Sequence, residues 1–170
     1  MLGFLFRGLT ASPSRGAALF DTVTAEARQR GWYVEADVPD TLDGRFAVLA
    51  TLAAMVIVRL EQLGEAGQIL SVALTERFIE IMESEHRELG LGDPALGKTV
   101  RKLVGSLGRR TGIIRATVGG AIDWQEAAAQ CLYKSPPSQA SLGAAATALE
   151  QLWGRLAQTD AGALAEGRIV

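Results

Sequence analysis

The sequence is poor in the residues that build disulfides, metal sites and β-sheets. It contains one cysteine, Cys131, and one histidine, His86, which excludes an internal disulfide and the usual histidine-rich metal sites. Aromatic residues make up 6% of the chain, and no stretch alternates β-branched or aromatic residues with polar ones. Because strands are typically built from such stretches, their scarcity favours a fold of packed helices.

Patterns typical of active sites are also missing. The glycines are too sparse to form a phosphate-binding loop. Cys131 lies in an alanine-rich helical context, which is typical of a small buried thiol, and no nucleophile is placed for His86 to activate. We therefore expect a protein that is not an enzyme and that binds no cofactor or metal.

One acidic cluster leaves an alternative open. Asp37, Asp40 and Asp43 recur at every third residue, and carboxylates are the ligands that Mg²⁺ and Ca²⁺ prefer. Their spacing does not match the Ca²⁺-binding loop pattern, and helix capping accounts for them without a metal. A metal-dependent enzyme acting on a small molecule is therefore the least favoured alternative.

The stretch 38–63 is the one around which the chain is organised. Every residue from Phe46 to Val58 is apolar except Thr51. As a helix this run spans about 20 Å, against about 30 Å of membrane hydrocarbon, and Arg45 and Arg59 flank its ends. The pattern predicts the buried central helix of a helical domain, not a membrane span.

The start of this central helix carries its own signals. Pro39 marks a turn, and either Asp40 or Thr41 can cap the first helical turn. Asp43 suits the positive end of the helix dipole. We expect Arg45 to pair with a nearby carboxylate such as Asp43.

Apolar residues at helical spacing predict further helices on both sides of this stretch. They cover residues 16–30, 71–89, 93–118 and 123–133, and a last helix follows a cap at Ser138. The segment GEAG at 64–67 is predicted to be a break, and Trp32 begins an irregular connection. The prediction is an all-α fold, a single compact domain of about six helices.

Three regions follow from this pattern. Residues 16–158 form the helical domain, and residues 159–170 form a short C-terminal turn or tail. Residues 1–15 form a flexible or loosely packed segment with an apolar tip, MLGFLFRGL, that lacks the pattern of a secretory signal. A bacterial cytoplasmic protein is the simplest interpretation, and peripheral contact with the inner face of the cytoplasmic membrane is the alternative that the apolar tip leaves open.

Charge is nearly balanced overall, with a net charge of −2, but it is unevenly distributed. No acidic residue lies between Asp93 and Asp123, and six basic residues fall in this stretch: Lys98, Arg101, Lys102, Arg109, Arg110 and Arg115. This face is either simply solvated or contacts an acidic protein surface, anionic lipid or RNA phosphates. Without interleaved exposed aromatics, sequence-specific nucleic-acid recognition is not supported.

Several glycines fall in the same basic helix. Each costs roughly 1 kcal/mol of helix propensity relative to alanine. Such residues indicate close packing or a bent, accommodating surface: Gly97, Gly105, Gly108 and Gly112.

In combination, several motifs resemble the ubiquinol–cytochrome c chaperone family, the bacterial relatives of the mitochondrial assembly factor for cytochrome b. They are Trp32-Tyr33, VPDTLDGRF at 38–46, LTERF at 74–78, HRELGLGD at 86–93 with Gly97-Lys98, and Gly108-Arg109. The positions that match the family signature are Asp40, Asp43, Gly44, Arg45, Phe46, Gly90, Asp93, Gly97 and Lys98.

The resemblance implies an all-helical, non-enzymatic assembly chaperone. Such a protein receives newly made cytochrome b, or another membrane-protein client, for assembly of the ubiquinol–cytochrome c reductase complex. A second assembly factor and the ribosome are further partners that it implies. The closest alternative is a helical interaction module with an unrelated partner. We predict that four basic residues contact the partner electrostatically: Lys98, Arg101, Lys102 and Arg109.

Overall fold

Helix α3 (Leu42–Glu61) runs through the middle of the protein and is the helix around which the others pack. The structure is a computed structural model that describes residues 13–90 and 92–170. Thr41 caps α3, because its hydroxyl accepts a hydrogen bond from the Gly44 amide at 3.2 Å. From Ala47 to Val58 every residue except Leu49 is buried. The predicted buried central helix is therefore confirmed.

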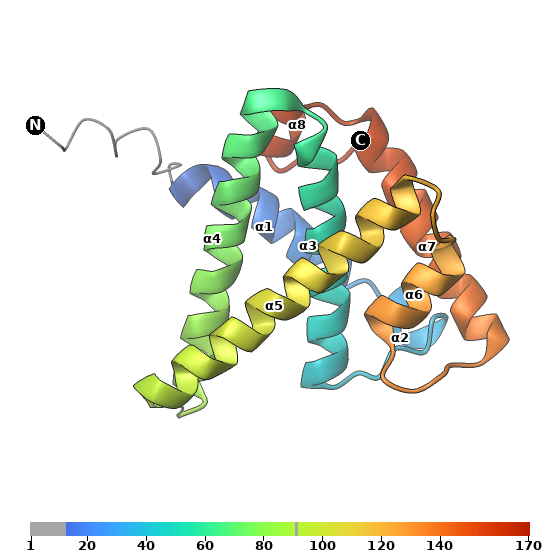
Figure 1. Ribbon diagram of the computed structural model, residues 1–170, viewed down its shortest axis with the longest axis horizontal. Helices are drawn as coiled ribbons and strands as arrows, with labels where there is room; N and C mark the ends of the chain where they lie inside the picture. Colours follow the sequence, from blue (N-terminus) through green and yellow to red (C-terminus); the bar gives the residue numbers. More distant parts are fainter. Residues whose placement is uncertain (1–12, 91) are drawn as a thin grey trace, which may run out of the picture.

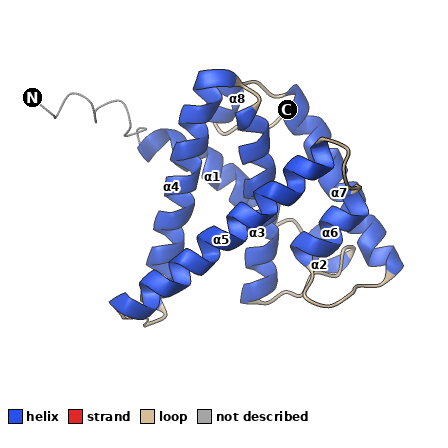
Figure 2. Ribbon diagram, viewed as in Figure 1, coloured by secondary structure: helices blue, strands red, loops and turns tan. Residues whose placement is uncertain are grey.

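The remaining helices of the described chain surround α3 on several sides. They are α1 (Pro13–Ala27), α2 (Gly31–Val34), α4 (Gly64–Glu88), α5 (Asp93–Val118), α6 (Trp124–Leu132), α7 (Gln139–Gln158) and α8 (Ala161–Ala165). Figure 1 shows α4 to one side of α3, α6 and α7 to the other, and α5 crossing it. Over residues 13–90 and 92–170, Figure 2 shows helices and loops without strands. The all-α prediction is confirmed, and the short helices α2 and α8 add to the six expected ones.

Helix α4 begins earlier than the sequence pattern predicts. The segment 64–67 is the first turn of α4 and not a break. Gly64 has a φ of +68°, which a glycine adopts without strain and which reverses the chain after α3. Gly67 is buried, and a Cβ atom there would overlap the Leu60 carbonyl oxygen. Both glycines therefore serve a tight corner between two helices.

Trp32 and Tyr33 lie in a helical turn, α2, where an irregular connection was expected. The Trp32 indole donates to the Glu26 carbonyl at 3.0 Å, and the Tyr33 hydroxyl donates to the Ala27 carbonyl at 2.8 Å. The last carbonyls of a helix have no partner within it, so these two side chains cap the C-terminal end of α1. This cap explains why α1 ends at Ala27 and not at the predicted Arg30.

The caps of α6 and α7 lie where the sequence predicts them. The Asp123 carboxylate accepts a hydrogen bond from the Glu126 amide at 2.8 Å. The Ser138 hydroxyl accepts one from the Ser141 amide at 3.1 Å. Helix α5 also matches its predicted bounds, 93–118. Local cap signals are sufficient to place these helix ends.

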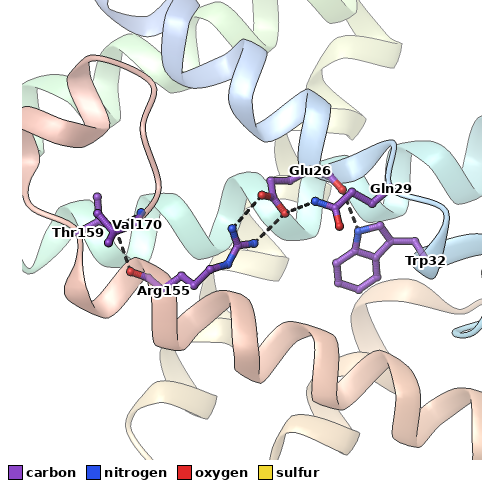
Figure 3. Close-up of polar contacts among 6 residues, drawn as sticks. All are labelled: Glu26, Gln29, Trp32, Arg155, Thr159 and Val170. Atoms are coloured by element: carbon purple, nitrogen blue, oxygen red, sulfur yellow. Dashed lines mark hydrogen bonds and ion pairs between the residues drawn. The ribbon is translucent and has the colours of Figure 1, made fainter.

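A polar network joins both ends of the described chain to α7 (Figure 3). Arg155 on α7 donates two hydrogen bonds to the Glu26 carboxylate on α1, at 3.0 and 2.9 Å. Thr159 is fully buried; its hydroxyl donates to the Arg155 carbonyl and accepts from the Val170 amide. Residues 159–170, predicted as a turn or tail, thus contain α8 and pack on the domain.

The predicted N-terminal segment falls mostly on residues 1–12, which lie outside the described residues, while residues 13–15 begin α1. Across residues 13–90 and 92–170, none of the helices combines the length and the apolar character that crossing a membrane requires. Helix α3 illustrates this, because Arg59 lies within its last turn and Asp43 within its first.

Candidate functional site

The outer face of α5 is the strongest candidate for a partner-binding surface. Lys98, Arg101 and Lys102 are all exposed on it. Among the side chains that the structure describes, none of these three forms an ion pair. Their charge is therefore available to an outside partner. We call this surface the α5 face; it comprises the exposed residues Lys98, Arg101, Lys102, Gly105, Gly108, Arg109 and Gly112.

The glycines of the α5 face have no packing role inside the protein. A Cβ atom added to Gly105, Gly108 or Gly112 would meet nothing within 4 Å. Close packing within the chain, one of the two interpretations that the sequence allowed, is therefore wrong for these residues. What they provide is a strip of bare helix backbone on the outside of the molecule.

Arg109, the fourth predicted contact residue, is exposed but also has a structural role. Its guanidinium donates to the Gln130 carbonyl at 2.9 Å. The next residue, Arg110, donates to the Cys131 carbonyl through Nε at 3.2 Å and Nη2 at 2.8 Å. Both arginines therefore hold the C-terminal end of α6, where carbonyl oxygens lack helical partners.

Arg110 is buried, with 7% of its surface exposed, and has no carboxylate partner among the described side chains. It also donates to the Ser106 carbonyl and hydroxyl, and its guanidinium lies 5.8 Å from the centre of the Phe46 ring. Burial lowers the pKa of Arg110. In the sequence Arg110 resembles its basic neighbours, so this structural arginine could not be distinguished from the predicted contact residues.

Cys131 has the environment of an unreactive thiol. It is 1% exposed, and burial raises the pKa of Cys131 to about 11, although the nearby Arg110 and Arg109 act in the opposite direction. Nucleophilic chemistry requires the thiolate, which is scarce at neutral pH with such a pKa. The expected small buried thiol is confirmed.

The signature residues at the start of α3 mostly shape a tight turn. Gly44 is buried against Pro39, whose carbonyl oxygen a Cβ atom would overlap. Arg45 pairs with Asp40 at 2.6 Å and not with Asp43 as expected, because Thr41 takes the cap position and leaves Asp40 free to pair.

Asp43 pairs instead with Lys134, in the loop between α6 and α7, at 2.5 Å. The hydrogen bond from Lys134 lowers the pKa of Asp43, and the positive charge of Lys102 on α5 adds to the effect. Within the described residues, no three histidine, cysteine or acidic side chains gather closely enough to hold a metal ion. Asp40 and Asp43 are therefore accounted for by basic partners.

The other signature positions also hold helix ends and the core. Gly90 has a φ of +86° and ends α4, as predicted. Phe46 is half-buried, with its ring 6.1 Å from that of the fully buried Phe78. Gly97 lies on α5, and Asp93 is the first residue of that helix. Most of the signature thus describes a fold, and Lys98 is its member on the α5 face.

Comparison with known proteins finds the family that the motifs resemble. A profile of the family described as ubiquinol-cytochrome C chaperone matches residues 34–170. The chain belongs to the ubiquinol–cytochrome c chaperone family. A structure described as the crystal structure of the Cbp3 homolog from Brucella abortus is similar, with 25% identity and a TM-score of 0.77. The similarity covers 99% of this chain and 95% of that one, and a search of curated proteins found no match.

For a member of the ubiquinol–cytochrome c chaperone family, the expected functional feature is a surface that binds a client protein. The α5 face fits this expectation in kind, since it offers charge and an unobstructed backbone. Figure 1 shows α5 crossing in front of α3, the central helix that it packs against.

Proposed function

We propose that this chaperone binds newly made cytochrome b through the α5 face and holds it for assembly of the ubiquinol–cytochrome c reductase complex. The observation that supports this proposal is that Lys98, Arg101 and Lys102 are exposed and have no ion-pair partners among the described side chains. They lie beside glycines at which a Cβ atom would enter open space. Holding a client requires no reacting group, so the protein acts without catalysis.

The two features of the α5 face suit a membrane-protein client. Helices of membrane proteins associate where small residues let their backbones approach closely, and Gly105, Gly108 and Gly112 offer such a strip. Exposed cations attract anionic lipid heads and acidic loops at the membrane surface. This supports action at the cytoplasmic face of the membrane, where the client is inserted.

A helical interaction module with an unrelated partner is the competing function, because charge alone does not choose among acidic partners. A second assembly factor and the ribosome are further candidate partners of the same face. All of these proteins are recoverable in one affinity experiment, which therefore tests the client and its rivals together.

The test is an affinity pull-down of the tagged chaperone from solubilised membranes and ribosomes of its own cells. We expect the wild type to recover cytochrome b. The double variant Lys98→Glu/Arg101→Glu should recover at least about tenfold less of it, because the new carboxylates repel an acidic partner surface. Arg28→Glu/Arg30→Glu is the matched control, since both residues are exposed and lie off α5.

Two results would contradict this proposal in different ways. Recovery of another partner without cytochrome b from the wild type would favour the unrelated interaction module. Equal recovery of cytochrome b by the wild type and the α5 double variant would support cytochrome b as the client and contradict the α5 face as its binding surface.

A further inference from the structure

A small apolar groove lies between α4 and α8, away from the α5 face. It has a volume of about 250 Å³. Its lining includes Ala66, Ile69, Leu70 and Ala73 of α4 and Ala161 and Ala165 of α8. Ile69 remains 40% exposed, and Val72, which lies three residues further along α4 and outside the lining, is 48% exposed. The volume is below the roughly 300–1,000 Å³ of small-molecule sites, and it suits one or two inserted apolar side chains.

The wall of this groove that α4 contributes touches the beginning of α1. A Cβ atom at Gly16 would lie 2.5 Å from the carbonyl oxygen of Ala73, which lines the groove. Thr22, in the second half of α1, donates a hydrogen bond of 2.6 Å to the carbonyl of Gly167, so the same helix also lies against the chain that follows α8. The chain that precedes α1 therefore joins the domain beside the groove, and Figure 1 shows α1 beginning next to α4.

The residues before α1 are apolar, as the lining of the groove is. Between positions 2 and 9 the sequence reads LGFLFRGL, with five large apolar residues: Leu2, Phe4, Leu5, Phe6 and Leu9. These residues lie outside the described part of the chain. We propose that residues 2–9 dock in the groove between α4 and α8 and cover Ile69 and Val72.

Tethering and reach support this occupant over a free partner. Residues 10–12 separate the strip from Pro13, and together with Pro13 they make up the about four residues that a chain reversal needs. Eight extended residues reach about 26 Å, whereas the groove wall at Ala73 lies within one helical turn of the start of α1. A segment tethered this closely is present at an effective concentration in the millimolar range, which favours it over untethered competitors.

Disulfide crosslinking in the full-length purified protein tests the proposal. We expect Phe6→Cys with Ile69→Cys to form an intramolecular crosslink at least tenfold faster than the control pair Phe6→Cys with Gln125→Cys on α6. Cys131 does not compete, because it is buried. Equal rates for the two pairs, or a crosslink that forms only between two copies, would overturn the proposal.

Hydrogen exchange provides a second measurement that leaves the core unchanged. We expect Phe4→Asp/Phe6→Asp to speed amide exchange in residues 66–73 at least threefold, since the groove then loses its cover, while residues 47–58 keep their rates. Unchanged exchange in residues 66–73 would show that the strip does not occupy the groove. Neither experiment involves a client, so each outcome is independent of the function proposed above.

Discussion

Arg110 is a buried cation whose partners are carbonyl oxygens, the Ser106 hydroxyl and an aromatic ring. Removing a guanidinium from water is costly, and here the compensation comes from the negative end of the α6 dipole and from the Phe46 ring. The side chain thereby joins three helices: α5, which carries it, α6, whose last turn it caps, and α3, which contributes Phe46. A guanidinium is suited to this role because its several donors are fixed in one plane.

Replacing Arg110 should therefore destabilise the fold. We expect Arg110→Met to lower the free energy of unfolding by about 1–3 kcal/mol, because the Cys131 carbonyl loses its donor in a buried site. Urea denaturation measures this change. Arg109→Met is the control, and it should cost less than about 1 kcal/mol because Arg109 is exposed and water can replace it. An equal decrease in the free energy of unfolding in the two variants would show that the burial of Arg110 does not make it the more important of the two arginines for stability.

At the residue scale, the sequence predicted what depends on near neighbours. The caps at Thr41, Asp123 and Ser138 are set by residues within one turn, so their patterns could be recognised. The contact of Arg110 with Cys131 joins residues 21 positions apart, and nothing in the local pattern marks it. The structural and the solvent-facing arginines of α5 therefore looked alike before their burial was known.

Glycines serve two opposite purposes in these helices. At Gly67, α3 and α4 approach so closely that a side chain would overlap the Leu60 carbonyl oxygen. At Gly112 on α5, a Cβ atom would enter open space. The first glycine is required by the fold, whereas the second lowers helix stability without any internal compensation, as expected for a position kept free for a partner.

Alanine substitution should separate these two roles by sign. We expect Gly67→Ala to lower the free energy of unfolding by about 1–3 kcal/mol through overpacking. Gly112→Ala should raise it by up to about 1 kcal/mol, because alanine is the better helix former. Chemical denaturation of the two variants and the wild type gives the sign of each change in the free energy of unfolding. A loss of stability in Gly112→Ala would show that the fold needs this glycine.

At the element scale, helix bounds that depend on the local sequence were predictable, and bounds that depend on contacts between helices were not. The apolar residues of the stretch 93–118 recur at helical spacing, and both bounds predicted from the sequence agree with helix α5. The start of α4 was predicted too late, because glycines at 64 and 67 look like a break when their neighbours in space are unknown. The close approach of Leu60 gives Gly67 its reason, and that contact belongs to tertiary structure.

At the scale of the whole molecule, the last twelve residues close the fold against its first helix. Leu164 on α8 is fully buried, and Thr22 on α1 donates to the Gly167 carbonyl at 2.6 Å. Arg59, at the end of the central helix, donates to the Thr159 carbonyl at 3.3 and 2.9 Å. These bonds join residues 100 or more positions apart. The small and polar residues of 159–170 gave no local signal of such contacts, so the segment was predicted to be a turn or tail.

Deleting residues 160–170 should therefore destabilise the whole domain and not merely shorten a tail. We expect the free energy of unfolding to fall by about 3 kcal/mol or more, because burial of one leucine contributes about 1.5–3 kcal/mol and the hydrogen bonds of Thr22 and Thr159 add to it. Thermal and urea unfolding measure this change. Val170→Ala is the control, since that side chain is 65% exposed and should shift stability by less than about 0.5 kcal/mol. An unchanged unfolding midpoint after the deletion would mean that the C-terminal residues are a tail, and that α1 and α3 are held by the remaining helices alone.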